Sequence, residues 1–289
     1  MPNPIKYFEH GELYLVTSRT EEGLPFKNSL LYSVLFEAIL ARALFLYPVH
    51  IIGFTLEANH LHLLLCVINP EHLPLFVGYV KQELAHATNR FRGRKKKTVW
   101  CEGYDSPVLL GEKEALHYLT YIYTQARSNR TSLCNSWDMF SSGTLSKECK
   151  RRHRSSLKTD SEEESHILTL SPFAWIKTLC PERAEGEIRD DIVKRVMDAR
   201  SEGRITSFDP IEAENPENDD LYIPKKRGMR MFCICWNIER RKAYLEFIRA
   251  SIEKCREVLT LWRKGHFEVM WPPGFFPPSA VRRANLIPD

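Results

Sequence analysis

The stretch VHIIGFTLEANHLHLLLCVI, residues 49–68, decides the fold. Its two halves, 49–56 and 60–68, are apolar and rich in residue types typical of strands. Only the tripeptide EAN, residues 57–59, separates them. Two such runs joined by a short connection indicate a β-hairpin. The sequence therefore predicts a pair of antiparallel strands here.

Other elements surround this hairpin. Residues 12–19 alternate apolar and polar side chains, which predicts a strand, and residues 28–46 are apolar at helical spacing, which predicts a helix ended by Pro48. A second helix is expected at about 71–92, a short strand within 99–110 and a third helix near 112–129. The first six elements follow the β-α-β-β-α-β order of a ferredoxin-like antiparallel sheet with helices.

The remainder of the chain differs in composition. Residues 141–166 lack apolar periodicity and are dense in Ser, Lys, Arg and Glu, which is typical of a linker. Residues 167–289 are expected to form a mostly helical C-terminal extension with a long helix at about 238–264 and a Pro-rich tail. We therefore expect an α+β protein with a first domain over 1–140, a flexible basic and acidic linker over 141–166, and this extension.

The composition is that of a folded protein. The chain has 289 residues, 43% of them hydrophobic, a net charge of +4 and eight cysteines. Its apolar runs are shorter than the ~20 residues of a membrane span, and its start lacks the pattern of a signal peptide. The cysteines are scattered, which favours free thiols over a disulfide scaffold. We therefore expect a soluble cytoplasmic protein.

Basic residues gather in three clusters beside aromatic ones. Such clusters are either solvated loops or a phosphate-binding surface, and three of them favour the second interpretation. Trp100 and Tyr104 are candidates for stacking on bases, with a core position as the alternative for Trp100. The DNA-binding candidates are Arg19, Arg90, Arg92, Arg94, Lys95, Lys96 and Lys97, and further basic residues lie within 147–154 and 225–230.

His60 and His62 form a candidate metal site. On a strand, residues i and i+2 point to the same face, so both imidazoles can reach one ion while Leu61 packs on the other face. The pattern alone is weak evidence, because a pair of histidines satisfied by packing and hydrogen bonds is the more common explanation.

The third predicted helix supplies a nucleophile and a further ligand. Tyr121 and Gln125 are four residues apart and share a helical face, so the amide oxygen of Gln125 can complete a metal site beside the phenol. A tyrosine hydroxyl becomes a competent nucleophile where a base or a cation favours the phenolate. The alternative is that Tyr118, Tyr121 and Tyr123 are core aromatics, but only Tyr121 is followed by Gln at this spacing.

Residues 59–65 (NHLHLLL) resemble the metal-binding strand of HUH endonucleases, and residues 121–125 (YIYTQ) resemble the nucleophile helix of their single-tyrosine transposases. Residues 16–20 (VTSRT) and 99–104 (VWCEGY) also resemble REP-associated tyrosine transposases and their insertion-sequence-200-like relatives. The resemblance covers about residues 10–130. One departure is Gln125-Ala126, where the REP-associated group usually has Asn-Pro.

This resemblance implies an HUH-type catalytic domain over 1–140 and a divalent metal, Mg²⁺ or Mn²⁺, held by His60, His62 and Gln125. It implies that Tyr121 attacks single-stranded DNA bearing a hairpin and leaves a 5′-phosphotyrosyl link. Such transposases act as monomers or homodimers in the bacterial cytoplasm, on the nucleoid when bound. Two alternatives stay open: an idle, host-retained protein that binds hairpin DNA, and a metal hydrolase that uses water as nucleophile.

Overall fold

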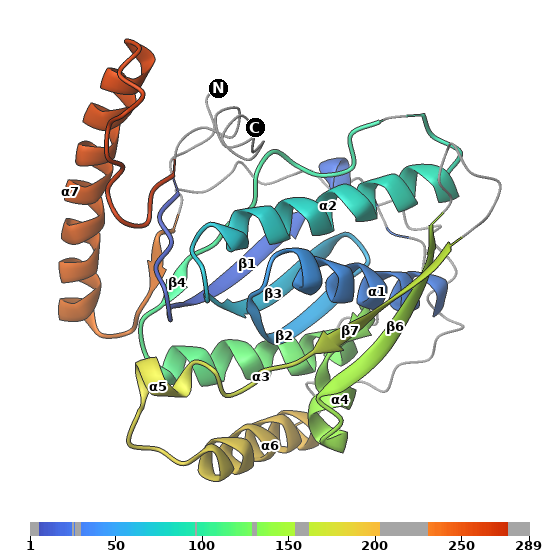
Figure 1. Ribbon diagram of the computed structural model, residues 1–289. Helices are drawn as coiled ribbons and strands as arrows, with labels where there is room; N and C mark the ends of the chain where they lie inside the picture. Colours follow the sequence, from blue (N-terminus) through green and yellow to red (C-terminus); the bar gives the residue numbers. More distant parts are fainter. Residues whose placement is uncertain are drawn as a thin grey trace.

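The computed structural model describes residues 6–24, 26, 30–95, 97–128, 132–153, 162–202 and 231–276, and these form an α+β fold with a mixed sheet (Figure 1). The strands are β1 (Leu13–Arg19), β2 (His50–Glu57), β3 (His60–Cys66), β4 (Val108–Leu109), β5 (Ser132–Asn135), β6 (Ser146–His153), β7 (Glu162–Thr169) and β8 (Cys233–Ile234). The helices are α1 (Leu30–Leu46), α2 (His72–Phe91), α3 (Glu112–Ser128), α4 (Trp137–Ser142), α5 (Ile176–Leu179), α6 (Glu185–Ser201) and α7 (Ile238–Arg263).

The main sheet has six strands in the order β5-β2-β3-β1-β4-β8. β1 and β2 flank β3 and are both antiparallel to it, β4 is antiparallel to β1, and β8 joins β4 in parallel. The predicted hairpin is confirmed as β2 and β3, with Thr55 opposite His62. The pair β2-β3 therefore lies in the interior of the sheet, with β5 and β1 on either side.

The two faces of the sheet bury different side chains. Leu63 and Leu65 of β3 pack in the core beneath α1 and α2, whereas Leu64 and Cys66 pack with α3. Successive residues of a strand point to opposite faces, so His62 lies on the α3 side with Leu64. Figure 1 shows α3 crossing this face and α6 lying outside it.

Gly53 lets α3 approach the sheet closely. A Cβ at this position would lie 2.9 Å from Leu119 Cδ1 and 3.4 Å from Tyr123 Cε1. The register of β2 against β3 shifts between Ile51 and Gly53, which marks a β-bulge. The bulge and the missing side chain together set the distance between α3 and the strands below it.

The segment 141–166 contributes β6 and the first part of β7 to a β-hairpin, which corrects our expectation of a flexible linker. β6 and β7 pair antiparallel and pack on α1 (Figure 1). Cys149 and Leu168 are buried on the inward side, and two ion pairs tie the hairpin to α1: Lys147 to Glu37 at 2.5 Å, and Glu164 to Arg42 at 2.8 Å. Two of the charges that indicated a linker, those of Lys147 and Glu164, instead pair with α1.

The C-terminal region continues the core of the N-terminal one. Ile188, Ile192 and Val196 of α6 are fully buried in the same cluster as α3, and β8 extends the main sheet. The long predicted helix is present as α7, whose buried residues are Ile248 and Cys255. No helix in the described part of the chain is long and apolar enough to span a membrane.

Candidate active site

His60 and His62 lie side by side on the α3 face of β3. Their ring centroids are 4.9 Å apart and their planes are nearly perpendicular, at 86°. His62 is 8% exposed and His60 is half-buried. The two rings thus form a partly buried pair at the start of β3, directly after the β2-β3 turn.

Each imidazole makes a hydrogen bond through Nδ1. Nδ1 of His60 lies 2.8 Å from Oδ1 of Asn59, and Nδ1 of His62 lies 3.0 Å from the hydroxyl of Thr17 on β1. When Nδ1 carries the proton and donates, Nε2 keeps its lone pair for a metal. The sequence predictions did not include Asn59 or Thr17 among the site residues. Asn59 could have been found, because it directly precedes His60. Thr17 could be found only from the strand register, which sets it opposite His62.

The surroundings keep both imidazoles neutral. Burial lowers the pKa of His60 to about 4, and the positive charge of Arg19 adds to this effect. Burial lowers the pKa of His62 to about 3, with further contributions from His60 and Arg19. A metal binds the unprotonated imidazole, so at neutral pH neither ring has to lose a proton before it can act as a ligand.

Tyr121 projects from α3 toward this pair. Its ring centroid lies 5.5 Å from that of His62, and the side chain is half-buried. Tyr123 is a core residue instead: it is fully buried, packs against Trp137 and Phe140, and has a pKa raised by burial. The core alternative therefore holds for Tyr123, while Tyr121 adjoins the histidines.

The third predicted ligand, Gln125, belongs to α3, one turn beyond Tyr121, but its side chain lies outside the part that the structure describes. Among the described residues, His60 and His62 are not joined by a third His, Cys, Asp or Glu in a cluster able to hold a metal. Two neutral imidazoles fit a divalent metal as ligands, and further donors have to come from an amide, water or substrate.

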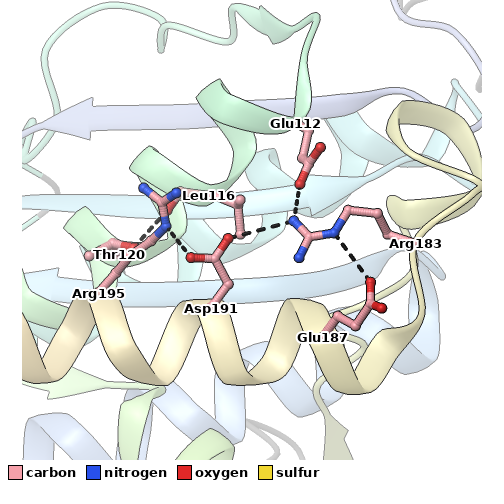
Figure 2. Close-up of polar contacts among 7 residues, drawn as sticks. All are labelled: Glu112, Leu116, Thr120, Arg183, Glu187, Asp191 and Arg195. Carbon is pink, nitrogen blue, oxygen red and sulfur yellow. Dashed lines mark hydrogen bonds and ion pairs between the residues drawn. The ribbon is translucent and has the colours of Figure 1, made fainter.

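An ionic network fixes α3 from its outer side (Figure 2). Arg183, just before α6, pairs with Glu112 in the first turn of α3, and with Asp191 of α6 at 3.6 Å. Arg195 pairs with the same Asp191 at 2.8 Å. The sequence predictions missed this network, because only the pairs within α6 have a recognisable i, i+4 spacing.

The predicted DNA-binding residues separate into surface and core. Arg19 is exposed at the end of β1, opposite His60. Trp100 is 8% exposed, packs against Phe26 at 5.4 Å and donates to the carbonyl of Lys81, so it occupies the core position that the sequence left open. Exposed basic residues follow the end of α2: Arg90, Arg92, Lys95 and Lys97, with Arg94 half-buried.

Tyr104 is half-buried, with the ammonium group of Lys6 over its ring. Lys96 and residues 225–230 lie outside the described residues, as do the side chains of Arg151 and Arg152 on β6. Among the described residues, the basic surface therefore extends from Arg90 to Lys97, and Arg19 lies closer to the histidines.

No family model matches the chain, and no curated protein matches it either. One comparison found a likeness. Among solved structures the chain is similar to a REP-associated tyrosine transposase bound to a REP hairpin, with a TM-score of 0.36 and 18% sequence identity. The match covers 43% of this chain and 72% of that one.

Proposed function

We propose that this chain is a metal-dependent transposase of the HUH single-tyrosine type, which cuts and rejoins single-stranded DNA through a phosphotyrosyl intermediate. The observation that carries the proposal is the position of Tyr121, whose ring centroid lies 5.5 Å from that of His62. His62 is paired with His60, and both imidazoles are neutral. The strand order β2-β3-β1-β4 with antiparallel neighbours supports the ferredoxin-like arrangement expected for this type.

His60, His62 and Gln125 would hold the metal, Mg²⁺ or Mn²⁺. The bound cation would polarise the scissile phosphate and offset charge that develops on its oxygens. Thr17 and Asn59 orient the two imidazoles through Nδ1, so the ligands are arranged before the metal arrives. The exposed Arg19 beside His60 adds a positive charge close to the same phosphate.

The phenol oxygen of Tyr121 would attack the phosphorus atom of one phosphodiester. A bond forms between phosphorus and the tyrosine oxygen, while the bond to the 3′ oxygen breaks; the phenol proton is released and the 3′ oxygen takes up a proton. The products are a 5′-phosphotyrosyl link and a free 3′-OH. Attack by a 3′-OH on the same phosphorus reverses these changes and rejoins a strand.

The substrate would be single-stranded DNA that bears a hairpin, and the exposed residues Arg90, Arg92, Lys95 and Lys97 would contact the phosphates of its stem. Such contacts fix the position of the DNA without selecting its sequence. Removing them is expected to weaken binding to all hairpins and to reduce its salt dependence.

The test is covalent trapping. The protein is incubated with labelled hairpin DNA and Mn²⁺, denatured, and separated by electrophoresis. Wild type is expected to give a labelled adduct, Tyr121→Phe none, and the control Tyr123→Phe an adduct, since Tyr123 lies in the core. An adduct that survives Tyr121→Phe would refute the nucleophile assignment. Cleavage without adduct would favour the hydrolase alternative, and binding without cleavage the idle protein.

A further inference from the structure

A row of aromatic rings leads away from the candidate site over α3. Tyr121 contacts Tyr118 at 6.3 Å between centroids, Tyr118 contacts His117 at 5.1 Å, and His117 contacts Trp236 at 5.5 Å. With the 5.5 Å contact between Tyr121 and His62, the row is continuous from the histidine pair to Trp236. These rings come from three parts of the chain that are far apart in the sequence, namely β3, α3 and the residues after β8, so the row exists only in the folded chain.

The outer end of this row is open to solvent. Trp236 is 55% exposed, His117 is exposed and Tyr118 is half-buried. Large aromatic side chains are usually buried, because their apolar area is costly to leave in water. An exposed indole held beside other rings is therefore a surface suited to stacking with another flat ring.

Trp236 is held in place by the core. Its backbone N–H donates to the carboxylate of Glu114, which is only 4% exposed on α3. The preceding strand β8 is hydrogen-bonded to β4, with the N–H of Leu110 donating to the carbonyl of Ile234 at 3.1 Å. The backbone that carries the indole is thus attached to two elements of the core, and the indole itself packs against His117, which lowers the cost of ordering it when a ligand binds.

The charge along the row favours a polyanion. Lys113, His117 and Tyr121 are spaced four residues apart on α3 and so lie on one helical face, with the exposed Lys113 at its start. Of the two acidic residues in the same turn, Glu112 is paired with Arg183 and Glu114 is buried against Trp236. Lys113 therefore adds a positive charge at the start of the row, and the two carboxylates of the same turn each have a partner.

We propose that Trp236, His117 and Tyr118 form a stacking platform on which successive bases of single-stranded DNA lie as the strand approaches Tyr121. Sequence-tolerant binding of single strands combines such rings with nearby positive charge, because every base has a face that can stack. This inference rests on the proposed function for its choice of ligand. It gives the C-terminal region a role, since Trp236 comes from that region.

The experiment measures binding apart from chemistry. A fluorescein-labelled single-stranded oligodeoxynucleotide of mixed sequence is titrated, with chelator present, against proteins that all carry Tyr121→Phe. Trp236→Ala is expected to weaken binding at least about 5-fold, equivalent to about 1 kcal/mol for one stacked base, and His117→Ala to weaken it less. Trp236→Phe keeps a stacking face and should restore most of the affinity.

Phe267→Ala is the matched control. Phe267 is 67% exposed and lies beyond the far end of α7, which spans about 39 Å at 1.5 Å per residue. Its removal should leave the affinity unchanged. As a direct readout, an oligonucleotide with iodinated uracil should crosslink to Trp236 under ultraviolet light, with the site mapped by mass spectrometry.

The outcomes separate this proposal from the proposed function. The platform is refuted if Trp236→Ala and Phe267→Ala bind single strands with equal affinity. It is also refuted if the protein that carries Tyr121→Phe alone shows no measurable binding of single strands. Even then, a covalent adduct between hairpin DNA and the protein with Tyr121 intact would still support the proposed function. Weaker binding by Trp236→Ala, without any adduct from wild type, supports the platform and refutes strand transfer.

Discussion

At the scale of single residues, Thr17 shows how the site depends on a neighbour that is not itself a ligand. Its hydroxyl lies 3.0 Å from Nδ1 of His62, just as the side-chain oxygen of Asn59 lies 2.8 Å from Nδ1 of His60. Partners of this kind fix the tautomer and the orientation of a ligating imidazole.

We expect Thr17→Val to weaken Mn²⁺ binding about 10-fold, the lower end of the range for such partners, because Nδ1 of His62 loses its hydrogen bond. Thr17→Ser keeps the hydroxyl and should bind Mn²⁺ nearly as well as wild type. Calorimetric titration measures both. Equal affinity of the Val and Ser variants would show that this contact does not orient the ligand.

The depressed histidine pKa values also predict a dependence of stability on pH. An unfolded histidine has a pKa near 6.5, whereas His60 and His62 have values of about 4 and about 3 in the fold. Between these values the unfolded chain takes up protons that the folded chain excludes, so the free energy of unfolding falls as pH drops from 6.5 toward 4. Thermal unfolding without metal should show this fall, and His62→Gln should show a smaller one.

Strand periodicity alone predicts that His60 and His62 share one face, and their rings do lie side by side; their role as metal ligands stays a prediction. The sequence allowed two positions for Trp100, either stacked on a base or packed in the core. An aromatic residue near a basic loop has the same local sequence in both cases. Its contacts with Phe26 and the Lys81 carbonyl come from other elements, so only the fold could decide.

At the scale of elements, the closeness of α3 to β2 determines where Tyr121 lies. Gly53→Ala would add a Cβ 2.9 Å from Leu119, and α3 or that side chain would have to shift. Overpacking of this kind costs about 1–3 kcal/mol, and we expect this loss of unfolding free energy in chemical denaturation. The shift should also slow formation of the adduct with Tyr121.

Gly78→Ala is the control for this substitution. Gly78 is exposed on α2 with no atom within 4 Å of an added Cβ, and alanine favours a helix by about 1 kcal/mol over glycine. This variant should be as stable as wild type or more so. If both variants were equally stable, the close approach at Gly53 would not constrain α3.

The hairpin β6-β7 and the strand β8 show which elements the sequence could not predict. The charge density of 141–166 suggested a linker, because among the described residues of this segment only Cys149, with Leu168 just after it, is buried on the inward side. The partners of its charges, Glu37 and Arg42, lie on the distant helix α1. β8 has two residues and is defined only by its pairing with β4. A strand that short has no periodicity to detect.

At the scale of the whole molecule, Arg183 connects the C-terminal region to α3. Arg183→Ala removes its pairing with Glu112 and with Asp191, so we expect a lower melting temperature and a weaker attachment of α6. Arg195→Ala is the comparison, because Arg195 pairs with Asp191 inside the same helix and is more exposed. A larger loss for Arg195→Ala than for Arg183→Ala would contradict the connecting role.

The pairing of β4 with β8 has a consequence for the order of folding. Val108 pairs with Cys233, which lies 125 positions further along the chain, whereas the hairpin β2-β3 closes across a few residues. The entropy of closing a loop grows with its length, and contacts between distant residues form slowly. We therefore expect the histidine strand to pair early in folding and β8 to join last, so that a chain emerging from the ribosome would complete the histidine pair before Trp236 reaches the far end of the aromatic row.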